Sequence, residues 1–256
     1  MAIARLDRTV IRLSGDGVKE WLDKLVTNNL DAPLTFTALL TPQGKIIADF
    51  FIASDGHDLL IDTATKFADG LLKRLKMYRL RAPIHIDVEE ALSVYALWNG
   101  EGEEGHLDPR HGSLGYRLIT DSDLDSTDDY NTHRLSLGVT DSQWDFETAQ
   151  VFPADVNMDL MNGVDFKKGC FIGQEVVSRM KRMTQVKKRA RGLILQTPAK
   201  AGEKVKAGER VIGDILSTHG LMGIGLIRLD RWQSASESPT VDGRSVEIMG
   251  GVDGSR

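Results

Sequence analysis

The chain has 256 residues, of which 41% are apolar and 27% are charged, and its formal net charge at pH 7 is −5. These values are typical of a globular protein with one large domain or two smaller ones, and they exclude a disordered or collagen-like chain. The negative charge argues against nucleic-acid binding over the whole surface.

The N-terminal residues 1–17 lack the apolar core of a signal peptide. No segment approaches the length of apolar sequence that spans a bilayer. The single cysteine cannot form an internal disulfide, which suits a reducing compartment. The sequence therefore predicts a cytoplasmic protein without a membrane partner.

The first elements alternate between strand and helix. Residues 9–15 alternate apolar and polar side chains as a half-buried strand does, and Asp16 is positioned to cap a following helix. One face of that helix would carry Val18, Trp21, Leu22, Leu25 and Val26. Residues 36–63 contain three apolar runs joined by "TPQG" and "SDGH", which predicts an antiparallel meander.

The middle of the chain mixes helices and strands. Apolar residues at helical spacing predict a helix over residues 65–80, and strands resume at 84–90 and 93–99. Residues 100–128 are acidic and carry glycines, which predicts a surface loop, and a helix is expected near residues 127–137. This order of elements is typical of the α+β class.

After Arg191 the sequence consists of short apolar runs separated by glycine, aspartate and proline. This pattern predicts a small all-β module that closes as a barrel or sandwich, because closure removes exposed strand edges. The last residues, 250–256, are expected to fray.

Several familiar ligand motifs are absent from the sequence. The six histidines show no metal-binding pairing, so a structural zinc site is not expected. Neither a dinucleotide fingerprint nor a phosphate-binding loop occurs.

Cys170 lies between Gly169 and Gly173, follows Lys167 and Lys168, and precedes a predicted helix. A thiol before a helix N-terminus and beside lysines has surroundings that favour the thiolate. The alternative is a small buried residue in a tight turn. One thiolate cannot hold an iron–sulfur cluster, so no metal site is expected within one chain and further ligands would come from a partner or a small thiol.

Asp49 is a carboxylate inside the apolar run "GKIIADFFI". Strand alternation places it on the same face as Ile47 and Phe51, so that this face could line a ligand. A buried carboxylate needs a partner. The alternative is an edge-strand aspartate that faces water.

Residues 179–191 carry seven cations and no acidic residue. Such a run could receive a polyglutamate tail, RNA or an acidic protein, or it could be a solvated connector. Aromatic residues do not interleave with it, so direct nucleic-acid binding is not expected.

The segments "KGCFIGQE" (168–175), "LTPQGKIIADFFI" and "HRLSLGV" together resemble the YgfZ family. Its members are folate-binding relatives of the glycine-cleavage T-protein and include a mitochondrial iron–sulfur assembly factor. The resemblance implies an α+β, T-protein-like body with mixed antiparallel sheets and helices. That body, residues 1–190, would contain two interleaved subdomains and a channel for tetrahydrofolate, and a small β-barrel would follow at 191–256.

The resemblance also implies the roles of single residues. Cys170 would be the reactive motif cysteine, completed by Lys168, Gly169, Gly173, Gln174 and Glu175, and Asp49 would act at the folate nitrogen. Tetrahydrofolate would be bound by Asp49, Asp155, Asn157 and Arg179. Two positions depart from the pattern: Asp155 is one methylene shorter than the usual glutamate, and Met183 and Thr184 replace a common Arg-Gly pair.

Three hypotheses follow from the sequence. The leading one is a tetrahydrofolate-binding accessory factor for assembly or repair of iron–sulfur proteins, including enzymes that thiolate tRNA. Its partners would be iron–sulfur carrier or client proteins, with a cluster shared transiently through Cys170. The alternatives are a folate-dependent aminomethyltransferase or other one-carbon transferase, and a scaffold whose folate pocket is vestigial.

Overall fold

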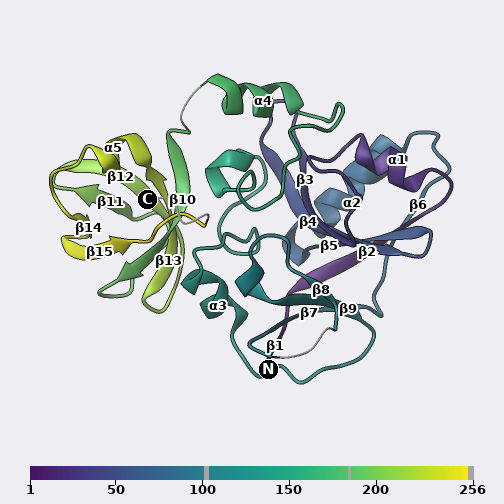
Figure 1. Ribbon diagram of the computed structural model, residues 1–256, viewed down its shortest axis with the longest axis horizontal. Helices are drawn as coiled ribbons and strands as arrows, with labels where there is room; N and C mark the ends of the chain where they lie inside the picture. Colours follow the sequence, from purple (N-terminus) through teal and green to yellow (C-terminus); the bar gives the residue numbers. More distant parts are fainter. Residues whose placement is uncertain (101–103, 184–185, 253–256) are drawn as a thin grey trace.

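The computed structural model describes residues 1–100, 104–183 and 186–252. The chain forms a five-stranded sheet, a four-stranded sheet and a closed C-terminal barrel (Figure 1). Residues 253–256 of the predicted frayed tail lie outside the described residues, as does Thr184 of the Met183–Thr184 departure.

The five-stranded sheet has the order β3-β4-β5-β2-β6. Its strands are β2 (Arg8–Ser14), β3 (Leu34–Leu40), β4 (Ile46–Asp55), β5 (Asp58–Ala64) and β6 (His85–Val88). Strands β3, β4 and β5 pair in antiparallel fashion with short turns between them, so the predicted meander is confirmed.

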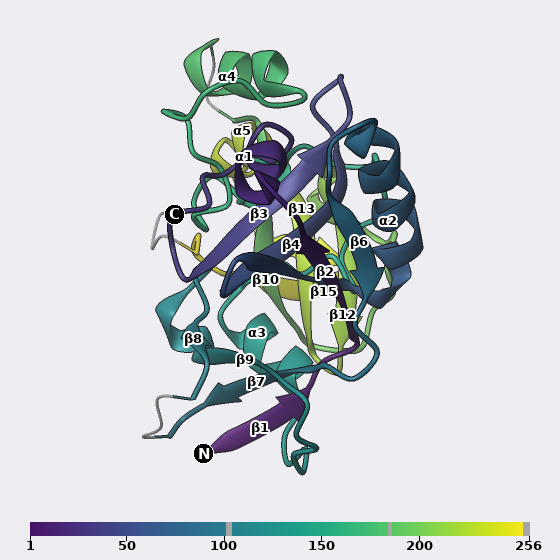
Figure 2. The same cartoon turned by 90° about the vertical axis from the view of Figure 1, so that its right-hand side faces the viewer.

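Two helices cover one face of this sheet, α1 (Val18–Asp23) and α2 (Thr65–Arg79). Figure 2 shows α2 along the outside of the sheet. The predicted helix at 65–80 is confirmed. The prediction that Asp16 caps α1 is wrong, because Gly17 occupies the cap position with φ of 72° and no side chain caps the helix. Leu25 and Val26, expected on the helix, lie beyond its end.

The four-stranded sheet has the order β1-β7-β9-β8 and packs against the other face of the first sheet. Its strands are β1 (Ala2–Arg5), β7 (Ser93–Trp98), β8 (His106–Leu107) and β9 (Tyr116–Thr120), with the short helix η1 (Gly112–Leu114). The prediction of a surface loop over 100–128 is therefore wrong for residues 106–120, which contain β8, η1 and β9, whereas residues 121–128 form a largely exposed loop as predicted. Its charged side chains Asp108, Arg110 and Arg117 are buried because they pair with one another.

Three more helical elements lead to the barrel: α3 (Tyr130–Ser136), η2 (Pro153–Val156) and α4 (Gln174–Met183). The helix predicted near 127–137 is confirmed as α3, which is capped by the Asp129 side chain. No helix in the described ranges is long and apolar enough to cross a membrane.

The barrel closes in the order β10-β13-β12-β11-β14-β15, which confirms the predicted closed β module. Its elements are β10 (Lys188–Leu195), β11 (Lys204–Ala207), β12 (Arg210–His219), β13 (Met222–Arg228), α5 (Leu229–Gln233), β14 (Pro239–Val241) and β15 (Arg244–Ile248). Polar contacts fix it to the body: Arg189 pairs with Asp159 at 2.8 Å and His219 with Asp129 at 2.7 Å.

Candidate functional site

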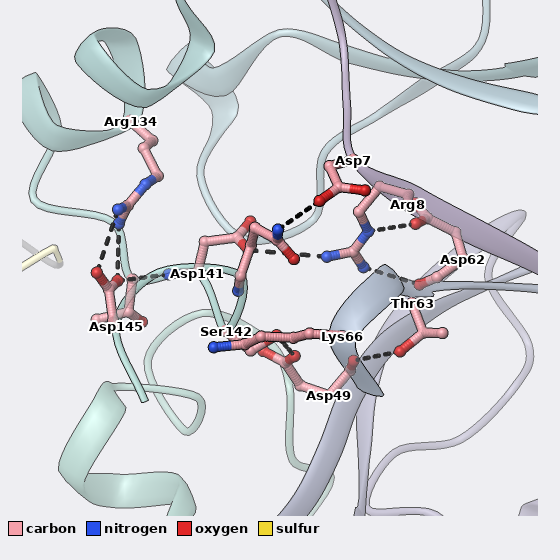
Figure 3. Close-up of polar contacts among 12 residues, drawn as sticks. Asp7, Arg8, Asp49, Asp62, Thr63, Lys66, Arg134, Asp141, Ser142 and Asp145 are labelled. Atoms are coloured by element: carbon pink, nitrogen blue, oxygen red, sulfur yellow. Dashed lines mark hydrogen bonds and ion pairs between the residues drawn. The ribbon is translucent and has the colours of Figure 1, made fainter. Parts of the chain in front are cut away.

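Asp49 lies in the middle of β4 and is buried. The Ser142 hydroxyl donates a hydrogen bond to its Oδ1, and Thr63 Oγ1 donates to its backbone carbonyl at 3.4 Å (Figure 3). No described residue forms a hydrogen bond with Oδ2. Asp49 is therefore not the water-facing edge residue that the sequence left open.

The surroundings of Asp49 favour its neutral form. Burial, followed by repulsion from the Asp141 carboxylate, raises the pKa of Asp49 to about 6. The hydrogen bond from Ser142 and attraction to Arg8 and Arg110 act in the opposite direction. The carboxyl is thus poised between its protonated and ionised forms near neutral pH, as a group that exchanges a proton with a ligand should be.

A chain of ion pairs lies beside Asp49 in the interior, as Figure 3 shows for Asp141, Arg8 and Asp62. Arg110 Nη1 lies 3.0 Å from Asp141 Oδ2, and Arg8 Nη1 lies 3.7 Å from Asp141 Oδ1. Burial alone would raise the pKa of Asp141, but Arg110, Arg8 and Arg134 together hold it well below its usual range. Asp141 is therefore the ionised neighbour that repels charge on Asp49.

The same network joins the two sheets around an aromatic ring. Asp62 accepts from Arg8 Nε at 2.5 Å and from Arg117 Nε at 2.7 Å. Asp108 pairs with Arg110 at 2.8 Å, and the Arg117 guanidinium carbon lies 3.9 Å from the centre of the Phe51 ring. The guanidinium groups thus pack on an aromatic face as well as on carboxylates.

We call this set the buried charge cluster. It contains four guanidinium groups and five carboxyl groups, those of Arg8, Arg110, Arg117, Arg134, Asp49, Asp62, Asp108, Asp141 and Asp145. With every group ionised its charge is four minus five, or −1. The cluster is neutral when Asp49 holds a proton, which agrees with the direction of its pKa.

The raised pKa predicts how Asp49 affects stability with pH. Because the folded protein binds this proton more tightly than the unfolded chain, the contribution of Asp49 to stability falls as pH rises from about 4 to about 6. Asp49→Asn lacks this titration. As pH rises over this interval, the free energy of unfolding of the wild type should fall relative to that of the variant by on the order of 2–3 kcal/mol. Urea unfolding at several pH values tests this, and parallel stability curves for the two proteins would contradict it.

Sequence reasoning missed most of this cluster. Asp62 carries the same signal as Asp49, a carboxylate within the apolar strand "LLIDT", and could have been found by it. Arg8, Arg110 and Ser142 carry no such signal, because they sit in polar or mixed segments and meet Asp49 and Asp141 only through the fold.

The Lys168 side chain holds the motif loop to the body. Its ammonium is 3.0 Å from Asp23 Oδ1 and donates to the carbonyls of Asp23, Val26 and Asn28 at 2.6–3.0 Å. The expectation that Lys168 activates the neighbouring thiol does not fit this geometry, because the ammonium is engaged by these acceptors.

The two motif glycines have different surroundings. Gly173 has φ of +81°, and a Cβ there would stand 2.7 Å from the carbonyl oxygen of Thr41 and 3.1 Å from Gly44 Cα. This glycine lets α4 start directly against the β3–β4 turn. Gly169 has open space around a built Cβ. The Gln174 amide donates to the Gly169 carbonyl at 3.2 Å and closes the loop.

Cys170 is exposed in this loop. The alternative of a buried turn residue is therefore not what the structure shows. No described hydrogen bond or ion pair joins Cys170 to Asp49, which is buried between the sheets. Glu175 forms an exposed pair with Arg179 at 3.2 Å on the first turns of α4. The two candidate reactive residues thus belong to two separate places.

A tetrahydrofolate fits these residues only in part. Asp49 offers a free oxygen and a transferable proton to a ligand nitrogen. Asp155 instead accepts from the Phe152 amide and faces Lys188 at 3.4 Å. Asn157 donates to the Ala190 carbonyl at 2.9 Å, while Arg179 lies on the exposed side of α4. The structure does not bring these three side chains to Asp49.

Comparisons with known proteins show the fold. The CAF17 C-terminal beta-barrel domain matches residues 181–249. A solved structure of glycine cleavage system aminomethyltransferase T from Bartonella henselae superposes with a TM-score of 0.73 at 12% identity, over 99% of this chain and 87% of that chain. The chain therefore has a T-protein-like α+β fold with a C-terminal barrel.

Curated relatives carry iron–sulfur assembly names. The mitochondrial iron-sulfur cluster assembly factor IBA57 homolog of Neurospora crassa is 30% identical over 236 residues, covering 77% of this chain and 54% of that protein. The human mitochondrial factor IBA57 is 25% identical over 98% of this chain and 84% of its own length. The chain spans little more than half the length of the fungal relatives it matches.

The names of these relatives correct one expectation. The sequence predicts a cytoplasmic protein, but the fungal, human and mouse relatives are all named as mitochondrial. The prediction is wrong because it relied on the absence of a secretory signal, and such an absence does not distinguish the cytoplasm from an organelle.

Proposed function

We propose that this protein is a tetrahydrofolate-binding accessory factor of the YgfZ type that assists assembly or repair of iron–sulfur cluster proteins, including enzymes that thiolate tRNA. The observation that carries the proposal is the intact "KGCFIGQE" loop, which presents Cys170 to solvent on a T-protein-like body. Relatives named as iron–sulfur cluster assembly factors support it.

The loop provides what a transfer site for a cluster or for sulfur needs. Lys168 and Gly173 hold its base rigidly against the body, while the thiol stays accessible. A thiolate is a good ligand for iron and a good acceptor of sulfane sulfur. Because one cysteine cannot complete a cluster, the client or carrier protein supplies the other ligands.

The folate part of the proposal rests on Asp49. A bound tetrahydrofolate would supply a nitrogen that carries one-carbon units. The chain itself would orient that nitrogen with the free Asp49 oxygen, exclude water by burial, and hold a proton on the carboxyl near neutral pH. Calorimetry with tetrahydrofolate under argon should show stoichiometric binding that Asp49→Ala weakens. Absence of binding to the wild type would favour a scaffold instead.

The test of the main proposal uses cells that lack this protein. Activity of a four-iron, four-sulfur enzyme is measured under oxidative stress after rescue with wild type or with Cys170→Ser. We expect only the wild type to restore activity, because serine keeps the shape but is a poor iron ligand. Equal protein levels on an immunoblot serve as the control. Equal rescue by both proteins would reduce Cys170 to a turn residue and end the thiol part of the proposal.

A second candidate function is a folate-dependent aminomethyltransferase or other one-carbon transferase. The buried Asp49 with its raised pKa favours it, since such a carboxyl can assist proton transfer at a folate nitrogen. Turnover of an aminomethylated carrier protein with tetrahydrofolate, lost in Asp49→Asn, would support this candidate. No turnover by the wild type would remove it.

A further inference from the structure

Charge is distributed very unevenly along this acidic chain. Residues 167–189 contain eight lysines and arginines and one glutamate, a net charge of +7. Since the whole chain has a net charge of −5, all other residues sum to −12. A molecule with such a charge separation orients an approaching charged partner before contact.

Part of this positive charge lies on one side of α4, a surface we call the α4 outer face. It consists of Gln174, Glu175, Ser178, Arg179 and Arg182, which line a shallow hollow. Figures 1 and 2 both place α4 at the periphery of the molecule. The inner side of the helix packs on the body through Val177, which is buried.

The cations of this surface are available to a partner. Arg179 forms its ion pair with Glu175, but its side chain remains 66% exposed. Arg182, and Lys167 in the loop that precedes α4, are exposed and have no carboxylate partner within the described ranges. Exposed charges of this kind contribute little to stability and can pair with opposite charges on another molecule.

The loop beside the α4 outer face also leaves room for a partner. A Cβ built on Gly169 would meet nothing within 4 Å, and the backbone there does not require glycine. No described residue therefore explains a glycine at this position. A missing side chain next to the exposed Cys170 allows the backbone of another molecule to approach the thiol closely.

We propose that the α4 outer face is a docking surface for an acidic protein surface, which it steers onto Cys170. This docking surface deepens the proposed function. It rests on that function in one respect, because the partner is taken to be the protein that exchanges sulfur or a cluster with the thiol. A protein fits better than single-stranded RNA, because the α4 outer face has no aromatic side chain on which a base would stack.

The experiment uses Cys170 as its own reporter, since it is the only cysteine. Two peptides of equal length, one rich in glutamate and one neutral, each carry a cysteine as a pyridyl disulfide. The Cys170 thiolate attacks the peptide sulfur and releases pyridine-2-thione, whose absorbance gives the rate. We expect the acidic peptide to react about tenfold faster at about 0.01 M salt and the two peptides to react alike at about 1 M salt.

Reversing the charges of the α4 outer face tests whether this face causes the preference for the acidic peptide. Arg179→Glu combined with Arg182→Glu should abolish the preference, measured as the ratio of the rates with the acidic and the neutral peptide. The matched control, Lys73→Glu combined with Arg74→Glu, reverses two exposed cations on α2 and should keep the preference. The neutral peptide also verifies that each variant is folded around its loop.

Three outcomes would overturn the proposal. The first is equal rates for the two peptides at low salt, and the second is a preference that survives reversal at Arg179 and Arg182. The third is binding of single-stranded RNA through this face with no preference for the acidic peptide. Because neither cluster nor folate takes part, the result is independent of whether the rescue by Cys170 succeeds.

Discussion

Replacement of Asp62 by asparagine is expected to lower the free energy of unfolding by about 3–5 kcal/mol. Asp62 is fully buried between the guanidinium groups of Arg8 and Arg117, at 2.5 and 2.7 Å. Burial alone would raise the pKa of Asp62, but Arg117 and Arg8 outweigh it and lower the pKa, so the group is ionised. Asparagine keeps the volume and removes the charge, which leaves two buried cations short of a counter-ion.

The expected loss of stability is large because Asp62 joins the two sheets. Arg8 and Asp62 lie on β2 and β5 of the five-stranded sheet, whereas Arg117 lies on β9 of the four-stranded sheet. Loss of the carboxylate therefore weakens the contact between the two sheets as well as the ion pair within the five-stranded sheet.

Denaturant unfolding of wild type and Asp62→Asn measures the effect. Asp31→Asn provides the matched control, because Asp31 forms an exposed pair with Lys19 and its loss should cost no more than ~0.5 kcal/mol. A loss below about 1 kcal/mol in Asp62→Asn would mean that the neighbouring aspartates compensate and that the cluster is not rigid.

The regular elements of this fold follow closely from local patterns. Three apolar runs separated by "TPQG" and "SDGH" predict the meander, since period-two apolar runs and turn residues are short-range signals. The helix at α2 follows in the same way from apolar residues at helical spacing. The N-terminus of α1 does not, because the backbone at Gly17, rather than a side chain at Asp16, starts that helix.

The segment around β8 and β9 shows where local reasoning fails. Its charges predict a solvated loop, yet Arg117 is buried against Asp62, which is 55 residues away in the sequence. Burial of a charge depends on a partner, and the partner is known only once the fold is known. A polar segment with short strands therefore carries no local sign that it forms part of the core.

Some features of the candidate site likewise follow from neighbouring residues in the sequence, and others depend on distant ones. The exposure of Cys170 agrees with the glycines and lysines around it, which are local features. The role of Lys168 does not follow from its neighbour in sequence, because its ammonium binds the carbonyls of Val26 and Asn28 more than a hundred residues earlier. Asn157 likewise serves the contact with β10.

Replacement of Gly173 by alanine is expected to loosen the motif loop and to lower the free energy of unfolding by about 2–3 kcal/mol. The φ of +81° strains any side chain, and the new Cβ would meet the Thr41 carbonyl at 2.7 Å and Gly44 at 3.1 Å. Because both obstacles are backbone atoms of the β3–β4 turn, α4 must move away from that turn. The loop that carries Cys170 moves with it.

Gly169→Ala is the matched control, since its Cβ meets nothing within 4 Å and its backbone needs no glycine. It should change stability by no more than ~0.5 kcal/mol. Denaturant unfolding gives the stability of both variants, and the alkylation rate of Cys170 with a neutral reagent reports the loop. An equal and small effect in the two variants would mean that α4 is not held by the contact between Gly173 and the β3–β4 turn. A large effect in Gly173→Ala alone would show that this contact holds α4 and the Cys170 loop against the β3–β4 turn.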